Sequence, residues 1–231
     1  MSSALIISYD GTANDDDALA LGKMLAPAGF TPVLAYVRHT KEFDPGREEL
    51  AEHDAEQRLE RGAGMLGDPG AKREVLFGAS TGEGLGQLAE RAGASLVVFG
   101  SDYRTAPGHS QPGTSAQHLL DGGAVSVAVA VSGLRTRLNE PIKLIAVPVA
   151  GPRNEDARKT AGALAEKLGA KLEESPAEPV DLIVVGSQPD APAGRVVVGG
   201  DVRAELDRAR SSVLVVPAGA PHLPYPGPAV G

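Results

Sequence analysis

The chain has 231 residues, a formal net charge of -8 and no cysteine. The acidic balance argues against a surface for nucleic acid or anionic membrane, which needs clustered Lys and Arg, and the missing thiols exclude disulfides, zinc–thiolate sites and cysteine nucleophiles. No apolar run reaches the roughly 18 residues of a membrane span and Met1 leads directly into a short strand, so we expect a cytoplasmic protein without a nucleic-acid or membrane partner.

Short apolar strands alternate with helical patterns through the first part of the chain. Continuously apolar strands separated by helices indicate a parallel sheet covered on both faces, with right-handed crossovers. The predicted fold class is therefore α/β. We expect strands over residues 4–9, 31–38, 74–77, 96–99 and 125–131, and helices over 15–26, 47–65 and 81–92, with a short helix from 113.

The first predicted helix has an acidic start. Asn14 is its expected cap, and the three aspartates Asp15, Asp16 and Asp17 then lie in the first turn. Carboxylates there complement the positive end of the helix dipole. Three acids in a first turn are typical of a helix start rather than of a metal site.

A loop without apolar periodicity runs from Gly100 to Gly113 and leads into Thr114 and Ser115. It follows a predicted parallel strand, and ligands of such sheets collect at the carboxyl ends of the strands. Free backbone N–H groups and hydroxyls at a helix start favour an anion such as phosphate. The same residues also fit an ordinary turn and helix cap.

The spacing within this loop resembles the universal stress protein family. After its fourth strand that family has a glycine, two residues, a second glycine, nine residues, and a glycine followed by Ser or Thr. Here Gly100 is followed at those distances by Tyr103 and by Gly113 with Thr114. The spacing matches, and Tyr103 stands at the second glycine.

The resemblance extends over residues 4–131, because the family opens with an apolar strand ending in Asp-Gly-Ser and Asp10-Gly11-Thr12 stands at that place. In nucleotide-binding members the aspartate contacts the nucleoside, the backbone after the second strand meets the adenine, and the glycine loop holds the phosphates. The resemblance therefore implies ATP or another adenine nucleotide as the cofactor, and no group of side chains in the sequence calls for a metal. The implied binding residues are Asp10, Gly11, Val37, Gly100, Arg104, Gly113, Thr114 and Ser115.

Two functions follow from this resemblance. Asp10 with Gly113 favours a stress-associated binding or signalling protein that holds a nucleotide without fast turnover. Tyr103, Pro107 and Pro112 favour an interaction scaffold that has lost the nucleotide, because a bulky side chain blocks close backbone approach and proline has no N–H. Both functions are those of a binding protein and not of an enzyme.

The pattern restarts after residue 141, as in a tandem member of the family. We expect a first domain over residues 1–134, a truncated second domain over 140–218 and a flexible tail over 219–231. The second domain has predicted strands over 142–149, 171–173, 180–185 and 212–216, and predicted helices over 154–168 and 201–208.

The second copy lacks the groups that the resemblance assigns to the ligand. Ala150 stands where the first copy has Asp10, and the loop spacing counted from Gly186 reaches Pro189 and then Gly199. We expect this copy to bind no nucleotide and instead to cover an unpaired sheet edge. Its last strand, 212–216, would pair with 125–131 in an intrachain pseudo-dimer, with a further homodimer left open.

A serine hydrolase is the alternative from another class. Residues 78–82 match G-x-S-x-G between a predicted strand and helix, as a nucleophile elbow does, and Asp102, His109 and His118 follow in a suitable order. No loop suited to an oxyanion hole precedes the motif. Ser80 also fits as a helix cap, and we therefore assign no catalytic residue.

Overall fold

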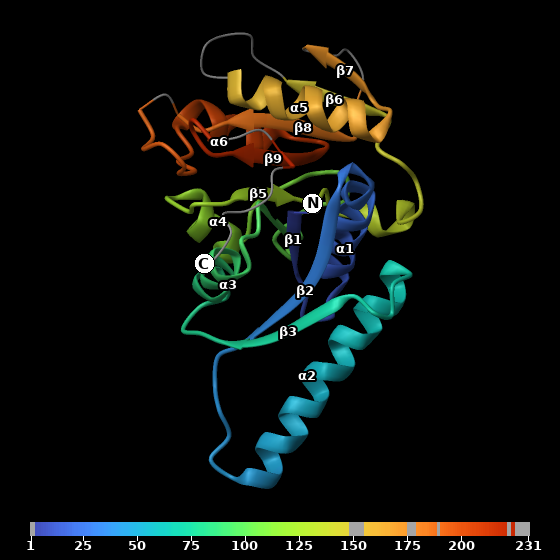
Figure 1. The fold of residues 1–231 in the computed structure, drawn as a ribbon, viewed down its shortest axis with the longest axis vertical. Helices are drawn as coiled ribbons and strands as arrows, with labels where there is room; N and C mark the ends of the chain where they lie inside the picture. Colours follow the sequence, from blue (N-terminus) through green and yellow to red (C-terminus); the bar gives the residue numbers. More distant parts are fainter. Residues whose placement is uncertain (1–2, 148–154, 175–178, 189, 221–222, 225–231) are drawn as a thin grey trace.

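The computed structural model describes residues 3–147, 155–174, 179–188, 190–220 and 223–224. One sheet of nine strands runs through it in the order β3-β2-β1-β4-β5-β9-β8-β6-β7 (Figure 1). The strands are β1 Ser3–Ser8, β2 Phe30–Arg38, β3 Lys72–Phe77, β4 Leu96–Phe99, β5 Ser126–Val129, β6 Leu144–Val147, β7 Lys171–Glu174, β8 Leu182–Gly186 and β9 Ser212–Val216. The helices are α1 Ala13–Leu25, α2 Pro45–Leu66, α3 Thr81–Ala92, α4 Thr114–Leu120, α5 Glu155–Leu168 and α6 Gly200–Arg208, with 3-10 turns η1 Ala26–Ala28 and η2 Leu134–Arg137.

Helices cover both faces of the sheet, as the apolar strands predict. Side chains of successive strand residues point to opposite faces. Ile7 of β1 therefore joins the core under α1, α2 and α5, while its neighbour Ile6 joins the core under α3, α4 and α6. The α/β fold class is confirmed.

The start of α1 differs from the expectation. Thr12 and not Asn14 is the cap: its hydroxyl accepts from the amide of Asp15, and the Asp15 carboxyl accepts from the amide of Thr12 at 3.0 Å. This reciprocal capping box satisfies two backbone donors, which a lone Asn14 cap would not do. The helix consequently begins earlier than residue 15.

The three aspartates that follow have separate structural roles. Asp16 accepts a hydrogen bond from the Tyr9 hydroxyl at 3.1 Å and lies 3.5 Å from the Arg61 guanidinium on α2. Asp17 is fully buried and accepts from the amides of Gly133 and Arg135 at 2.9 and 2.7 Å and from the Arg135 guanidinium at 2.9 Å. Asp17 thereby fixes the segment that leads from β5 to β6.

The two parts of the chain meet where β5 pairs with β9. This pair is antiparallel, with Val127 opposite Val215 and Val129 opposite Val213, whereas all other neighbouring strands in the sheet are parallel. The predicted pairing of 125–131 with 212–216 within one chain is confirmed. Outward from this junction, β9, β8, β6 and β7 repeat the order β5, β4, β1 and β2, and the described part of the second half has no counterpart of β3.

Matching loops on each side of the junction have the same internal hydrogen bonds. The Ser101 hydroxyl donates to the carbonyl of Ala130 at 2.6 Å, and the Ser187 hydroxyl donates to the carbonyl of Val216 at 2.8 Å. Gly113 and Gly199, which end the two loops, share φ −75° and ψ 172°. These repeated contacts are what an internal duplication of the two loops would produce.

Each of these two loops also donates one backbone hydrogen bond to the other half of the chain. The amide of Ser110 bonds to the carbonyl of Ala209 at 3.0 Å, and the amide of Val196 bonds to the carbonyl of Gly123 at 2.8 Å. Such exchange of equivalent contacts is what a two-fold relation produces. The loops after β4 and β8 therefore clasp the two halves together.

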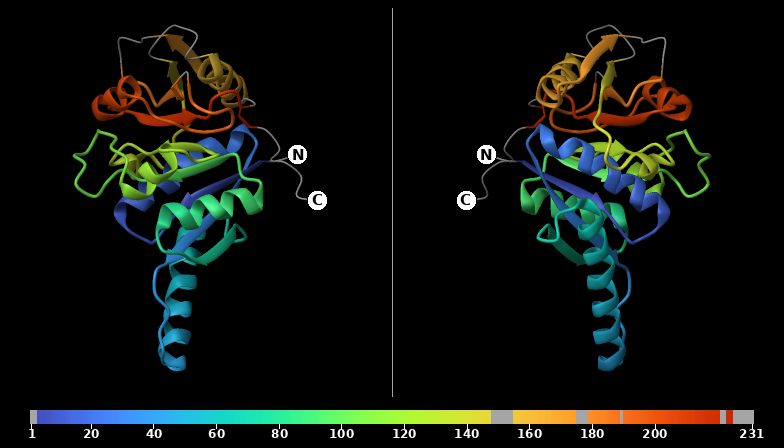
Figure 2. Two further views of the ribbon diagram at one scale, coloured as in Figure 1. Left: turned by 90° about the vertical axis from the view of Figure 1, so that its left-hand side faces the viewer. Right: turned by 90° about the vertical axis from the view of Figure 1, so that its right-hand side faces the viewer.

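The ends of the sheet and α2 are the most exposed elements. β3 and β7 form the outer edges and carry Lys and Glu side chains, which discourage pairing with another chain. α2 extends away from the sheet (Figure 2), leaving Phe43 and Leu50 exposed near its far end. None of the described helices has the length and apolar character needed to cross a membrane.

Most of the predicted tail, 219–231, lies outside the described residues.

The β5–β9 register gives a direct test in a chain without cysteine. A Val129→Cys, Val213→Cys double variant places two thiols on directly opposite residues, within the Cα separation of about 4.4–6.8 Å that a disulfide needs. On mild oxidation it should form an intrachain bridge, seen as a faster-migrating monomer on a non-reducing gel. The matched control is Val129→Cys with Val215→Cys, which is out of register and should oxidise more slowly. Exclusively interchain dimers would contradict the pairing.

Candidate functional site

The predicted ligand edge of the sheet is formed where β1, β2 and β4 end. Strand order reverses between β1 and β4, and ligands of such sheets commonly enter the crevice at this point. Here the first turn of α1 closes that crevice: a Cβ on Gly100 would overlap the backbone of Asn14. Gly100 is therefore required for close packing against α1, and the open space lies on the other side of β1.

A cavity of about 120 Å³ opens between the carboxyl ends of β1 and β2. Asp10 and Val37, which the resemblance assigns to the nucleoside, both line it. The cavity is smaller than the roughly 300–1,000 Å³ of typical ligand pockets, so it has room for one end of a nucleotide. Its lining also includes Ser8, Tyr9, Ala35, Tyr36, His39 and Thr81.

The backbone of Val37 is directed toward this cavity. β1 and β2 stay in register only as far as Ser8 and Ala35, after which the amide of Tyr9 donates to the carbonyl of Ala35 at 2.9 Å. Backbone groups two residues apart on a strand point the same way. The amide and carbonyl of Val37 thus face the β1 side, beyond the last paired residue of β1.

Asp10 stands at the rim of the cavity in a tight turn. Its carboxylate accepts from the amide of Thr12 at 3.2 Å, and its side chain is exposed. Gly11 has φ +90°, a left-handed conformation that favours glycine. The turn therefore presents the Asp10 carboxylate to solvent beside the cavity.

Asp15 stabilises this turn through hydrogen bonds to Asp10 and Thr12. Its carboxyl accepts from the amide of Asp10 at 3.3 Å and from the hydroxyl of Thr12 at 2.6 Å. Burial, together with a hydrogen bond to the Asp10 side chain and the charge of that carboxylate, raises the pKa of Asp15 to about 7. Close to neutral pH the Asp15 carboxyl is therefore partly protonated, and Asp10 and Asp15 together carry less than two negative charges.

The predicted phosphate loop has most of its amides engaged within the protein. The amide of Asp102 donates to the carbonyl of Gln111 at 2.8 Å, and that of Gly108 donates to the carbonyl of Ser132 at 2.9 Å. The amide of Ser110 bonds across the junction to Ala209, as described above. The stretch from Asp102 to Gln111 therefore has few backbone donors left for a phosphate, and the donors that remain are the amides of Gly113, Thr114 and Ser115 at the start of α4.

Arg104 is likewise engaged. Its Nε donates to the Asp102 carboxylate at 3.2 Å, and its guanidinium lies 5.0 Å from the centre of the Tyr103 ring. Hydrogen bonds from Arg104 hold the pKa of Asp102 below its usual value. Gly113 lies beside this carboxylate, since a Cβ there would be 3.9 Å from Asp102 Oδ2. Negative charge therefore adjoins the predicted phosphate position.

Thr114 and Ser115 begin α4 directly after this position. Gly113 is the cap and makes no side-chain hydrogen bond to the helix. The carbonyl of Ser115 packs against Gly82 of α3, where a Cβ would come within 2.6 Å. Gly100, Arg104, Gly113, Thr114 and Ser115 thus belong to one connected segment, but none of them lines the cavity of Asp10 and Val37.

Ser80 caps α3. Its hydroxyl accepts from the amide of Glu83 at 3.2 Å, which is the structural role that the sequence offered as the alternative to a nucleophile. Two histidines lie near this turn. His39 has its Nδ1 3.0 Å from the carbonyl of Gly78 and its Nε2 3.3 Å from the Thr81 hydroxyl, and His118 packs against Gly82. Within the described residues, no three His, Asp or Glu side chains gather in a way that could hold a metal ion.

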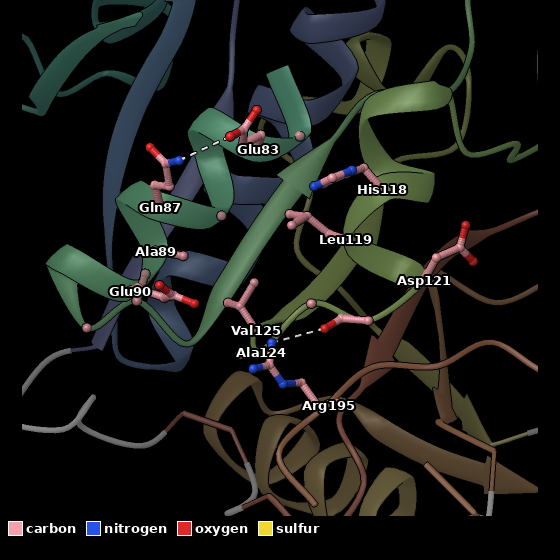
Figure 3. Close-up of a pocket in the computed structure, with 16 residues that line it drawn as sticks. Glu83, Gln87, Ala89, Glu90, His118, Leu119, Asp121, Ala124, Val125 and Arg195 are labelled. Atoms are coloured by element: carbon pink, nitrogen blue, oxygen red, sulfur yellow. Dashed lines mark hydrogen bonds between the residues drawn. The ribbon is translucent and has the colours of Figure 1, made fainter. Parts of the chain in front are cut away.

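A larger cavity of about 580 Å³ lies elsewhere, between α3 and α4 at the amino-terminal ends of β4 and β5 (Figure 3). Arg195 of the second half reaches into it and donates to the carbonyl of Gly122 at 3.1 Å. None of the binding residues predicted from the sequence lines this cavity. The second-half positions Ala150 and Pro189 fall outside the described residues.

Sequence reasoning missed part of the Asp10 cavity. Tyr36, His39 and Thr81 line it because they end β2 or begin α3, at the same edge of the sheet. Their positions near the ends of predicted strands could have indicated that they lie at this edge of the sheet. They belong to no family motif that would have marked them as binding residues.

Comparison with known proteins identifies the fold. The structure superposes on a universal stress protein from Archaeoglobus fulgidus DSM 4304 with a TM-score of 0.72, at 16% identity over 94% of this chain and 99% of the other. A candidate universal stress protein from Pseudomonas aeruginosa UCBPP-PA14 gives 0.54 at 12% identity, covering 93% of each chain. A functionally unknown protein from Pseudomonas aeruginosa PAO1 gives 0.53 at 12% identity, covering 93% of this chain and 92% of the other. No family model matches the sequence, and no curated protein matches it.

The raised pKa of Asp15 predicts a pH-dependent stability. Between pH 4 and 7 the unfolded chain ionises this carboxyl while the folded chain still holds the proton, since the pKa moves from 3.8 to about 7 on folding. The free energy of unfolding should therefore fall as pH rises through this window and then level off. Asp15→Asn keeps an acceptor for Thr12 but cannot ionise, so its stability relative to wild type should rise from pH 4 to pH 8.

Urea unfolding at these two pH values measures the difference. Glu52→Gln, which removes one exposed charge on α2, is the matched control and should show no such trend. An Asp15→Asn variant whose relative stability stays constant from pH 4 to pH 8 would mean that Asp15 ionises normally in the fold.

Proposed function

We propose, from the fold that this chain shares with universal stress proteins, that it is a stress-associated protein that binds an adenine nucleotide in its first half. The observation that carries the proposal is that Asp10 and Val37 line one cavity at the carboxyl edge of the sheet. That Asp10 and Val37, which are distant in sequence, line the same cavity supports the proposal.

The cavity suits the nucleoside end of such a ligand. The Val37 amide and carbonyl offer one donor and one acceptor, which matches the edge of an adenine ring. The Asp10 carboxylate at the rim is an acceptor for ribose hydroxyls. ATP and shorter adenine nucleotides share this end, so the cavity by itself does not select among them.

The loop from Gly100 to Ser115 remains the sequence-based candidate for the phosphates. Most of its amides between Asp102 and Gln111, and Arg104, are engaged within the protein, which favours the scaffold alternative, whereas the amides of Gly113, Thr114 and Ser115 at the start of α4 remain available to a ligand. Neither function involves fast turnover, because rapid phosphoryl transfer requires an aligned base or water-positioning group and usually a metal. Nucleotide binding separates the sensor from the scaffold.

Titration calorimetry with ATP and with adenosine tests the proposal. We expect one site per chain and a loss of about 1–3 kcal/mol in Asp10→Ala, the value of a buried hydrogen bond to a ligand. Asp68→Ala is the matched control: Asp68 makes the same kind of local turn, accepting from the amide of Gly70 at 3.1 Å, but does not line the cavity. Absence of binding would contradict the nucleotide sensor, and two equivalent sites would contradict a site restricted to the first half.

A further inference from the structure

A second cavity of about 200 Å³ adjoins the one that contains Asp10. The two share Tyr36 and His39, so they form neighbouring compartments at the end of β2. The first compartment is bounded by β1 and the start of α3, and the second by α2. A ligand held in the first compartment can therefore extend past Tyr36 toward α2.

Arg58 of α2 lines this second compartment without an ion-pair partner in the described part of the chain. Its Nη1 donates to the Tyr36 hydroxyl at 3.3 Å, and its guanidinium lies 5.4 Å from the centre of the Tyr36 ring. The other arginine of the compartment, Arg38, donates two bonds to the Glu48 carboxylate at 3.1 and 2.9 Å. Of these two guanidinium groups, Arg58 is thus the one that forms no ion pair within the described residues.

Arg58 is also close to the Asp10 turn. Its Cγ lies 3.8 Å from the position that a Cβ on Gly11 would take. The side chain therefore runs from the turn after β1 to Tyr36 at the end of β2. A planar guanidinium in this place can bind phosphate oxygens in pairs, on the side of the nucleoside cavity away from the loop of Gly100.

The charges around Arg58 limit how many phosphates fit. Glu42 and Asp54 also line the second compartment, and their carboxylates would repel a long phosphate chain. A single phosphate group can be paired with Arg58 alone. The compartment consequently favours a monophosphate over a triphosphate.

We infer that Arg58 binds the phosphate of a nucleoside monophosphate whose nucleoside occupies the Asp10–Val37 cavity. This inference rests on the proposed function and places the phosphate on α2 and not on the loop from Gly100 to Ser115. That loop keeps its role as the clasp between the two halves.

The test compares the affinities of adenosine, AMP and ATP for the full chain and for single variants. Wild type should bind AMP at least about tenfold more tightly than adenosine, as expected for a charge-assisted hydrogen bond, and no less tightly than ATP. Arg58→Ala should reduce AMP affinity to that of adenosine and leave adenosine affinity unchanged. Arg104→Ala tests the competing phosphate position in the predicted loop. Arg73→Ala, which removes an exposed arginine of β3 that lines neither cavity, is the matched control and should change neither affinity.

Three outcomes are distinguishable. If neither adenosine nor AMP binds, the proposed function itself fails. If both bind and Arg104→Ala, but not Arg58→Ala, removes the advantage of AMP, the phosphate lies in the loop and this inference alone is overturned. Arg58→Lys separates loss of phosphate binding from a folding defect. Lysine keeps the positive charge but lacks the paired hydrogen bonds of the guanidinium, so AMP affinity should be intermediate. Unchanged adenosine affinity would show that the variant is folded.

Discussion

The antiparallel pairing of β5 with β9 is the interaction on which the rest of the structure depends. It converts two parallel sheets into one sheet of nine strands and buries a strand edge that either half alone would expose. The loops after β4 and β8 then exchange equivalent hydrogen bonds across the junction. Asp17 completes the arrangement, because its buried carboxylate fixes the connecting segment through Gly133 and Arg135.

This junction also affects the proposed ligand edge of the sheet. The loop after β4 contacts the second half through the Ser110 amide, several of its other amides bond within the first half, and α1 closes the crevice next to Gly100. The open space is therefore displaced to the other side of β1, between the ends of β1 and β2. A fold shared with universal stress proteins thus has, in this chain, a cavity lined by Asp10, Tyr36 and Val37, which is the site we propose.

The sequence allowed the strand and helix order to be predicted, because apolar runs and helical periodicity record burial directly. The helix Thr81–Ala92 and the strands Leu96–Phe99 and Ser212–Val216 have the predicted limits. The cap of α1 was wrong because the reciprocal bond between Thr12 and Asp15 outcompetes Asn14. Asp17 as an anchor, and the internal use of the loop donors, depend on segments distant in sequence, which no local pattern records.

The central claim is that one adenine nucleotide binds between the ends of β1 and β2 of the first half. Amide hydrogen exchange of the full chain, measured with and without saturating AMP, tests this most directly because exchange slows where a ligand covers or orders the backbone. The account predicts slower exchange around Asp10–Thr12 and Tyr36–His39, with little change in the loop from Gly186 to Gly200. Protection confined to the second half, or to the loop from Gly100 to Ser115, would contradict it.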